Sequence, residues 1–355
     1  MNILFITPNG MDDQQFGGNK STYRNYSALS KIGNTMTYEI KKRSNVHSLI
    51  SMLELDVPPS NHKDISEIMR IVREKKIDVV VLDSSNFGNI AKAIKRNNTP
   101  LVVFCHNCES DFCKVRFGSD RGLKYKIYQM LIDKGEEKCI KAGDYIAVLT
   151  NRDKERIELL YDKRVDSVIT TGMKDLYQET DENRAPEEYC LLFGPCRTAN
   201  LEGFEWFVKN VSPYINCKTV VAGKGFEAYK EKWDNQYVNV IGYVQDVNEV
   251  YNKAKCVAIP LLSGAGMKIK TAEAMMFGKY IFGTSEAFVG FDSELNDIGT
   301  LCNTKEEFIH GINSFLESNN EFFFSRSRQI FKNKYDINSS DELFEKMINA
   351  VKKDN

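Results

Sequence analysis

Residues 260–284 read Pro-Leu-Leu-Ser-Gly-Ala-Gly-Met-Lys-Ile-Lys-Thr-Ala-Glu-Ala-Met-Met-Phe-Gly-Lys-Tyr-Ile-Phe-Gly-Thr. The apolar run Cys256–Ile259 comes just before this stretch, and a helical pattern covers Thr271–Phe277 within it. Glycines ahead of a helix leave its first N–H groups free to bind hydroxyl or phosphate oxygens. The stretch therefore predicts a strand, an anion-binding loop and a helix, the repeating unit of a parallel α/β sheet.

The same alternation of apolar runs and amphipathic segments extends over the rest of the chain. In the first half the predicted strands are Ile3–Thr7, Met36–Glu39, Val79–Leu82, Leu101–Cys105 and Tyr145–Leu149, and the predicted helices are Lys20–Ile32, Ile65–Lys75, Phe87–Arg96, Leu123–Lys141 and Arg152–Leu160. In the second half the strands are Tyr189–Phe193, Thr219–Ala222, Val238–Ile241, Cys256–Ile259 and Tyr280–Gly283, and the helices are Asn200–Val211, Val247–Lys253, Thr271–Phe277 and Glu306–Glu317. We therefore expect an α/β protein with two doubly wound sheets that face each other across a ligand-binding cleft.

Length also favours two domains, because 355 residues exceed what a single core usually supports. The polar segment 174–188 lacks apolar periodicity and contains a proline, which is typical of a linker. The expected domains are 1–173 and 189–335, followed by a tail at 336–355. Within that tail Ser339–Lys352 has the pattern of an amphipathic helix whose apolar side carries Leu343, Phe344, Met347, Ile348 and Val351.

Composition excludes several functional classes. Acidic residues (49) balance basic ones (48), so no global positive field favours nucleic-acid binding. The nine scattered cysteines are odd in number, which argues against a disulfide framework and favours a reducing, cytoplasmic environment. The charge is uneven, with 27 basic against 22 acidic residues from Met1 to Thr170 and 21 against 27 in the remainder.

Further glycine-rich turns follow the predicted strands. Gly17 and Gly18 lie between the first strand and the first helix, and Gly194 opens the turn that leads to Arg197. Similar turns lie at residues 223–225 and 242–244 of the second half. Backbone can approach a ligand closely at such turns, and Arg197 could meet a diphosphate, although each turn alone is as well explained as an ordinary loop.

His106 follows the strand Leu101–Cys105 directly, so it lies at a carboxyl end, where side chains reach ligand. It could donate a hydrogen bond or act as an acid or base. Cys105 and Cys108 have the two-residue gap of a zinc site, which leaves a metal interpretation open. Buried, unreactive thiols are the favoured account because no second Cys or His pair accompanies them, and we expect no metal.

Glu273 lies one turn beyond Lys270 on the predicted helix 271–277. It could be an exposed helical glutamate paired with Lys270. Its neighbours Ala274, Met275 and Met276 are apolar, however, and an unpaired carboxylate there would be costly. A bound polar ligand, such as vicinal hydroxyls, would explain it.

Taken together, these residues resemble a GT-B glycosyltransferase, most similar to the retaining family four, the glycosyl transferases group 1. The strongest match is Gly264-x-Gly266-x-Lys268-x-Lys270-x-x-Glu273, continued by Ala-Met-x-x-Gly278. Supporting matches are Gly17-Gly18, His106-Asn107-x-Glu109 and Asn200-x-x-Gly203-x-x-Trp206-Phe207. The resemblance spans nearly the whole chain and implies a C-terminal helix that packs back on the first domain.

The resemblance implies a nucleoside-diphosphate sugar bound mainly by the second domain and an acceptor bound mainly by the first. Glu273 would bind the ribose, the backbone of Tyr243 and Val244 would border the base, and Arg197, Gly18 and Lys268 would neutralise the diphosphate. His106 would meet the transferred sugar as the catalytic residue, with Asn107 and Glu109 on the acceptor side. The complete donor-binding set is Gly17, Gly18, Arg197, Gly225, Tyr243, Val244, Ser263, Gly264, Ala265, Gly266, Met267, Lys268 and Glu273. No cofactor or metal is expected, and UDP is the favoured nucleotide.

One position departs from the family pattern. The usual signature has a glutamate eight residues before Glu273, where this chain has Ala265.

The resemblance implies transfer with retention to a saccharide or lipid-linked acceptor in surface glycan or glycolipid synthesis. Two alternatives stay open: a non-catalytic nucleotide-sugar-binding partner protein, and a nucleotide-sugar epimerase of the same fold.

The basic first domain has two interpretations. Lysines and arginines at a protein surface attract anionic lipid, each contributing about 1 kcal/mol. The candidate contributors are Lys114, Arg116, Arg121, Lys124 and Lys126. They could equally form a solvated helix face, so a peripheral position on the inner face of the membrane is a hypothesis at this stage.

Overall fold

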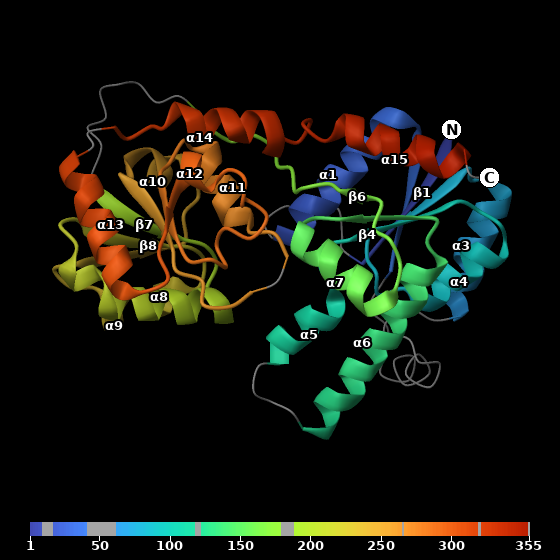
Figure 1. Ribbon diagram of the computed structural model, residues 1–355, viewed down its shortest axis with the longest axis horizontal. Helices are drawn as coiled ribbons and strands as arrows, with labels where there is room; N and C mark the ends of the chain where they lie inside the picture. The colour runs from blue at the N-terminus through green and yellow to red at the C-terminus, as the bar shows by residue number, and fades with distance from the viewer. Residues whose placement is uncertain are drawn as a thin grey trace. The chain divides into compact units, whose positions relative to one another are not determined.

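The structure is a computed structural model that describes residues 1–8, 17–40, 62–117, 122–178, 188–264, 266–318 and 321–353. The chain forms two compact units (Figure 1). Unit 1 comprises Met1–Met173 and Ile337–Asn355, together with residues 265–267, and unit 2 comprises Lys174–Gly264 and Lys268–Asp336.

Unit 1 is built on a six-stranded parallel sheet in the order β2-β1-β3-β4-β5-β6. Its strands are β1 (Asn2–Thr7), β2 (Asn34–Glu39), β3 (Val79–Leu82), β4 (Leu101–Cys105), β5 (Tyr145–Val148) and β6 (Ser167–Val168). Its helices are α1 (Gly17–Ile32), α3 (His62–Glu74), α4 (Gly88–Arg96), α5 (Glu109–Phe117), α6 (Leu123–Ala142), α7 (Asn151–Tyr161) and α15 (Asp341–Lys353). The strand order reverses between β1 and β3, which makes their carboxyl ends the switch point of this sheet.

Both faces of the unit 1 sheet are covered, which explains why β3 and β4 are apolar at every position. Residues of α3, α4, α6 and α7 form one core with alternate strand residues. On the opposite face α15 contacts β3, β4 and β5 and lies beside α1 (Figure 1). The ring of Phe344 on α15 stacks on that of Phe104 on β4, with their centroids 5.9 Å apart.

Arg24 of α1 is fully buried, and its guanidinium packs against both of these aromatic rings. Its Nη1 donates to the Thr170 carbonyl (2.6 Å) and to the Ser340 hydroxyl (3.1 Å). Burial lowers the pKa of Arg24 to about 9, against the opposing effect of Asp83 and Asp341. The tail segment around Ser340 and Phe344 therefore completes the core of unit 1.

Unit 2 repeats the architecture with a six-stranded parallel sheet in the order β12-β11-β10-β7-β8-β9. Its strands are β7 (Tyr189–Phe193), β8 (Lys218–Ala222), β9 (Val238–Gly242), β10 (Cys256–Ile259), β11 (Ile281–Gly283) and β12 (Gly299–Leu301). Its α-helices are α8 (Thr198–Asn210), α9 (Lys230–Trp233), α10 (Val247–Lys253), α11 (Ile269–Met276), α12 (Leu295–Ile298), α13 (Lys305–Ser318) and α14 (Ser325–Ile330). Helices α8 and α13 pack on one face, and the switch point lies between β7 and β10.

The predicted α/β architecture of two doubly wound parallel sheets is thus confirmed, and the tail helix packs on unit 1. Two local expectations were wrong. Leu343 was placed on the apolar side of the tail helix, but it is 40% exposed, because that helix has already buried Phe344 and Met347 against the sheet. The sequence analysis also predicted no helix between Leu101–Cys105 and Leu123–Lys141, but residues 109–117 form α5.

The segment 174–188, predicted as a linker, is described only at 174–178 and at Glu188. The described part packs on unit 2, where Asp175 pairs with Arg328 (2.6 Å) and Lys332 (3.2 Å). The Gln178 N–H donates to the Asn248 side chain (2.9 Å). These residues therefore belong to the body of unit 2. None of the described helices is both long and apolar enough to cross a bilayer.

Candidate functional site

At the carboxyl edge of the unit 2 sheet, three strand ends are joined backbone to backbone. Gly223 after β8 has φ +141°, and a Cβ there would lie 1.9 Å from the Gly194 carbonyl oxygen after β7. The Gly223 N–H donates to the Gly242 carbonyl (2.6 Å) at the end of β9. Only glycine allows this approach, so the three turns form one continuous backbone surface.

Glu227, which the sequence analysis did not single out, fastens two of these turns together. Its carboxylate accepts hydrogen bonds from the N–H groups of Gly225 (2.6 Å) and Tyr243 (2.9 Å). Backbone N–H groups, its own first, hold the pKa of Glu227 below its usual range. Gly225 itself has φ +97°, and the Tyr243 ring is 59% exposed. This carboxylate therefore fixes the turn that is predicted to border a nucleotide base.

The loop between β10 and α11 contributes a buried ion pair. Lys268, the residue before α11, lies 2.6 Å from Glu286, and both side chains are largely buried. A Cβ on Gly264 would lie 2.8 Å from Glu286 Oε1 and 3.0 Å from Lys268 Nζ. Glycine at position 264 thus lets the pair approach the loop backbone, which places a cation beside the glycine loop.

Lys270 and Glu273 both lie on α11. The Lys270 ammonium donates to the Asn200 side chain of α8, and the Asn200 amide donates to the Pro195 carbonyl (2.6 Å). Burial and the neighbouring Lys268 lower the pKa of Lys270 to about 8. Lys270 therefore helps to fix the turn after β7 through Asn200.

Glu273 is buried (6% exposed), so the exposed-glutamate alternative is wrong. It lies near the buried Tyr251, whose pKa is raised first by burial and then by the charge of Glu273. The Tyr251 ring stacks on Phe277 with centroids 4.4 Å apart.

The remaining donor-side residues are divided between the two units. Arg197 is exposed at the start of α8, and Ser263 is exposed after β10. Val244 is half-buried, Met267 is buried and Gly266 has φ +61°. Gly17 and Gly18 form the start of α1. Ala265 lies outside the described residues.

At the carboxyl edge of the unit 1 sheet the central group is Asp83, the residue after β3, which the sequence analysis missed. Its fully buried carboxylate accepts hydrogen bonds from Thr22 Oγ1 (2.6 Å) and Asn25 Nδ2 (2.6 Å) of α1. His106 Nε2 lies 2.9 Å from the same carboxylate. The predicted catalytic histidine is therefore held at the switch point of unit 1 by a buried acid.

The loop that carries His106 is anchored by a second buried acid. Glu136 of α6 accepts hydrogen bonds from the N–H groups of Glu109 (2.9 Å) and Ser110 (3.0 Å), at the start of α5. It also accepts from the hydroxyls of Ser85 (2.8 Å) and Tyr161 (2.7 Å). These four bonds fix the position of α5 and, with it, the residues that follow β4.

Glu109, predicted on the acceptor side together with Asn107, is half-buried near Glu136. Burial first and the Glu136 charge second raise the pKa of Glu109 to about 7, although hydrogen bonds from Asn86 and Asn107 oppose the shift. A carboxyl group with this pKa can take up or release a proton near neutrality. Asn107 and Glu109 thus lie in one polar group with His106.

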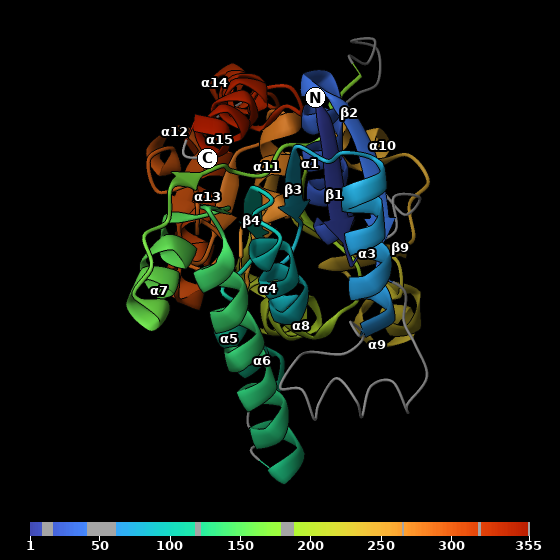
Figure 2. The same ribbon diagram turned by 90° about the vertical axis from the view of Figure 1, so that its right-hand side faces the viewer.

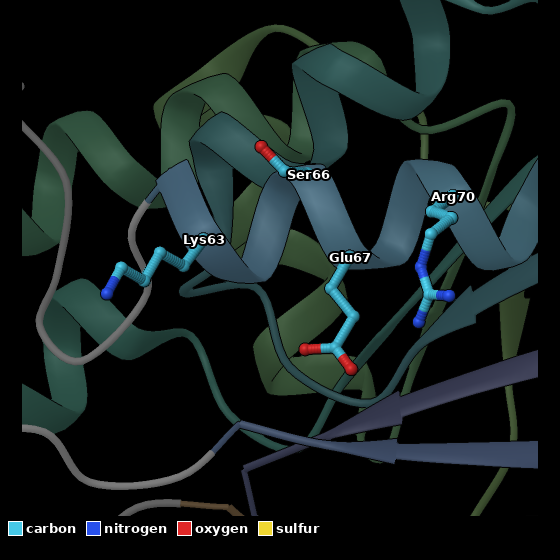
Figure 3. Close-up of a pocket in the computed structure, with 4 residues that line it drawn as sticks. All are labelled: Lys63, Ser66, Glu67 and Arg70. Atoms are coloured by element: carbon cyan, nitrogen blue, oxygen red, sulfur yellow. The ribbon is translucent and has the colours of Figure 1, made fainter.

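The cysteines near His106 are buried free thiols, and burial raises the pKa of Cys105 and Cys108. Among the described residues no group of three or more His, Cys, Asp or Glu side chains has an arrangement that could hold a metal ion. A separate hollow in unit 1 is lined by Lys63, Ser66, Glu67 and Arg70 of α3 (Figure 3). It contains none of the predicted site residues.

Known proteins resemble this chain in sequence and in fold. The sequence model of the family described as Glycosyl transferases group 1 matches residues 187–318, most of unit 2. A protein of Klebsiella pneumoniae, described as an uncharacterized 44.6 kDa protein in the cps region, is 23% identical over 272 residues. That alignment covers 68% of this chain and 65% of the length of the Klebsiella protein.

Several solved structures share the fold. HepE of Anabaena in complex with UDP has a TM-score of 0.69 at 12% identity, over 99% of this chain and 100% of that one. Sucrose-phosphate synthase from Thermosynechococcus elongatus has a TM-score of 0.73 at 10% identity, over the full length of both chains. WaaG, a glycosyltransferase involved in lipopolysaccharide biosynthesis, has a TM-score of 0.63 at 14% identity, over 97% of this chain and 99% of that one.

These likenesses establish the GT-B fold, and the family match confirms the predicted resemblance to the group 1 glycosyltransferases.

Proposed function

We propose that this GT-B chain transfers a sugar from a nucleoside-diphosphate sugar to a saccharide or lipid-linked acceptor in the synthesis of a surface glycan or glycolipid. The observation that carries the proposal is the carboxyl edge of unit 2. There, joined glycine turns, the cation Lys268 and the buried acid Glu273 lie within the segment that matches the family. A surface that carries the cations Arg197 and Lys268 suits a diphosphate, and a buried carboxylate suits ribose hydroxyls.

UDP is the proposed nucleotide, because the structures of HepE hold UDP or UDP-glucose. The proposed setting is surface glycan synthesis, because the Klebsiella relative is described as lying in a cps region and WaaG as acting in lipopolysaccharide biosynthesis. We propose a cytoplasmic location on the same grounds. The transferred sugar is proposed to be a hexose.

The chemistry of transfer assigns a role to each group. The bond between the anomeric carbon and the diphosphate oxygen breaks, the acceptor hydroxyl oxygen bonds to that carbon, and the hydroxyl proton is released. The departing diphosphate gains negative charge, which the cations Arg197 and Lys268 would stabilise. We propose that no metal ion is needed for this step. Retention of configuration is proposed from the family and is tested by the anomeric proton coupling of the product.

Calorimetric titration with UDP, GDP, ADP and CDP tests the donor site. One diphosphate should bind the wild type, and Glu273→Gln should weaken its binding by about tenfold, which is about 1.4 kcal/mol. Glu249→Ala, which removes an exposed glutamate from α10, is the matched control and should bind as the wild type does. If none of the four diphosphates binds, the donor-site proposal is wrong.

A second test separates an enzyme from the non-catalytic binding protein that Ala265 keeps open. The enzyme should slowly release sugar from its donor, whereas a binding protein should not. His106→Ala should abolish release while it leaves diphosphate affinity unchanged, because His106 belongs to unit 1 and the proposed nucleotide contacts to unit 2. Equal turnover in this variant would refute the role of His106.

We also propose that the helical hairpin α5–α6 places the protein on an anionic membrane. The hairpin projects from the sheet of unit 1 (Figure 1, Figure 2). Leu123 (75% exposed), Ile127 (43%) and Met130 (47%) lie at positions i, i+4 and i+7 on α6, so they form an apolar stripe on its solvent side. The same hairpin carries the basic residues Lys114 and Arg116 on α5 and Lys126 on α6.

Vesicle sedimentation tests this proposal. The wild type should sediment with phosphatidylglycerol-containing vesicles at low salt and less at high salt, because salt screens the charges. Leu123→Ser should reduce sedimentation. Leu159→Ser is the matched control, since Leu159 of α7 is equally exposed (74%) but lies off the hairpin. Failure of the wild type to sediment at low salt would overturn the membrane assignment.

A further inference from the structure

Three buried acceptor atoms without hydrogen-bond partners lie on the segments that border the carboxyl edge of the unit 1 sheet. They are Asn25 Oδ1 on α1, Asn86 Oδ1 after β3 and His106 Nδ1 after β4. Buried polar atoms are nearly always paired, so a group of three on neighbouring segments calls for an explanation. We call these three residues the acceptor triad.

Asp83 explains why two members of the triad present acceptors. The Asn25 amide donates to Asp83 Oδ1 (2.6 Å), and His106 Nε2 lies 2.9 Å from the same oxygen. Because both groups bind one atom, the amide and the ring are neighbours. When the ring is neutral and its Nε2–H donates to Asp83, Nδ1 carries a lone pair and can only accept.

Glu109 leaves a free acceptor on Asn86 in the same way, by taking up its amide donor. A hydrogen bond from the Asn86 side chain stabilises the ionised form of the Glu109 carboxyl group, so the amide of Asn86 is its donor. The carbonyl oxygen of Asn86 is then left as a buried acceptor. Two acids therefore engage the donors of the triad and leave three acceptors behind.

The charges around the triad limit what can bind there. Asp83, Glu109 and the buried Glu136 are carboxyl groups of the same edge. The fully buried Arg24 packs against two aromatic rings, and the charges of Asp83 and Asp341 act on it. A ligand must therefore donate hydrogen bonds, and a second negative charge would be repelled.

We infer that the acceptor triad binds the hydroxyl groups of an uncharged saccharide and selects against the same sugar when it carries a carboxylate. This inference rests on the proposed function, in which unit 1 binds the acceptor. It goes further in naming the charge of the sugar at this edge and the residues that select it. The His106 side chain is 14% exposed, so part of its ring reaches the surface of the unit.

Matched sugars test the inference on the full chain. Methyl glucoside and methyl galactoside are compared with methyl glucuronide and methyl galacturonide by saturation-transfer NMR titration. Each pair differs only by a carboxylate in place of a hydroxymethyl group. At least one neutral glycoside should bind, and its uronide should bind about tenfold more weakly or not at all.

Variants assign the binding to the triad. Asn86→Ala should weaken binding of the neutral glycoside by about fivefold or more, because one acceptor is removed. Asn25→Ala should do the same. Asn34→Ala is the matched control, since Asn34 is exposed at the amino end of β2, the opposite edge of the same sheet. If Asn25→Ala does not fold, the Asn86→Ala variant tests the inference alone, because Asn86 is only half-buried.

Three outcomes would overturn the inference. They are a uronide that binds as tightly as its neutral partner, triad variants that bind as the wild type does, and no binding by any neutral glycoside. The last result would mean that water alone satisfies the triad. UDP titration reports on unit 2 independently, so absence of glycoside binding to the wild type with UDP binding intact refutes this inference and leaves the donor site standing.

Discussion

Phe344→Ala should destabilise unit 1 far more than Leu343→Ala, although the two residues are adjacent on α15. Phe344 is fully buried, stacks on Phe104 and lies over the Arg24 guanidinium (5.1 Å), whereas Leu343 is 40% exposed. Truncation of a buried phenylalanine costs about 3–5 kcal/mol. The half-exposed leucine should contribute about 1 kcal/mol.

Urea unfolding measures this difference with two probes. At an m-value of about 2 kcal/mol per molar, the unit 1 midpoint should fall by about 1.5–2.5 M for Phe344→Ala and by about 0.5 M for Leu343→Ala. The chain has two tryptophans, Trp206 and Trp233, and both lie in unit 2. Tryptophan fluorescence therefore follows unit 2, while far-ultraviolet circular dichroism follows both units.

In Phe344→Ala we expect part of the circular dichroism signal to be lost before the tryptophan signal changes, because two-domain chains need not unfold in one step. Equal midpoints for the two variants would refute the packing argument. So would a Phe344→Ala variant whose first transition is the tryptophan one.

Three further predictions follow from the same structure. Gly223→Ala should abolish diphosphate binding, because its Cβ would lie 1.9 Å from the Gly194 carbonyl; unchanged calorimetric affinity would contradict the joined turns. The pKa of Glu109 is raised to about 7 in the folded chain, so its stabilising contribution should be complete below about pH 4.5 and lost as the pH rises through 7. Urea unfolding at pH 5 and pH 8 should show this loss in the wild type but not in Glu109→Gln. A thiol reagent should modify at most Cys196 and Cys217 in the folded protein, since the other seven of the nine cysteines are buried, and faster modification of Cys105 or Cys108 would disprove their burial.

Much of the fold could be predicted from the sequence, because each strand is a short apolar run between amphipathic helices. The bounds of β3, β4, β7 and β10 agree with those predicted. The short elements β6 and β12 were missed, since two or three residues cannot show a period. Helix α5 was missed because its apolar residues lie on more than one side, so it has no amphipathic pattern.

From the sequence we could predict only those parts of the candidate site that a local pattern marks. The glycine turns and the segment around Glu273 are contiguous in sequence and could be found. Asp83, Glu136 and Glu227 could not, because a single acid after an apolar strand or within a helix has no distinguishing signal. The partners of Asp83 lie 23 to 76 residues away along the chain, and only the fold brings them together.

The position of α15 has a consequence for biosynthesis. Arg24 is translated early, but its partner Ser340 lies 316 residues later in the chain. At bacterial rates of about 5–20 residues per second, this interval is about 15–60 s. During that time the face of the unit 1 sheet that α15 will cover has no partner, while all of unit 2 has already been synthesised. Unit 1 is therefore completed only after unit 2 has been synthesised. During this delay the uncovered face of the unit 1 sheet is the surface on which a chaperone would be expected to act.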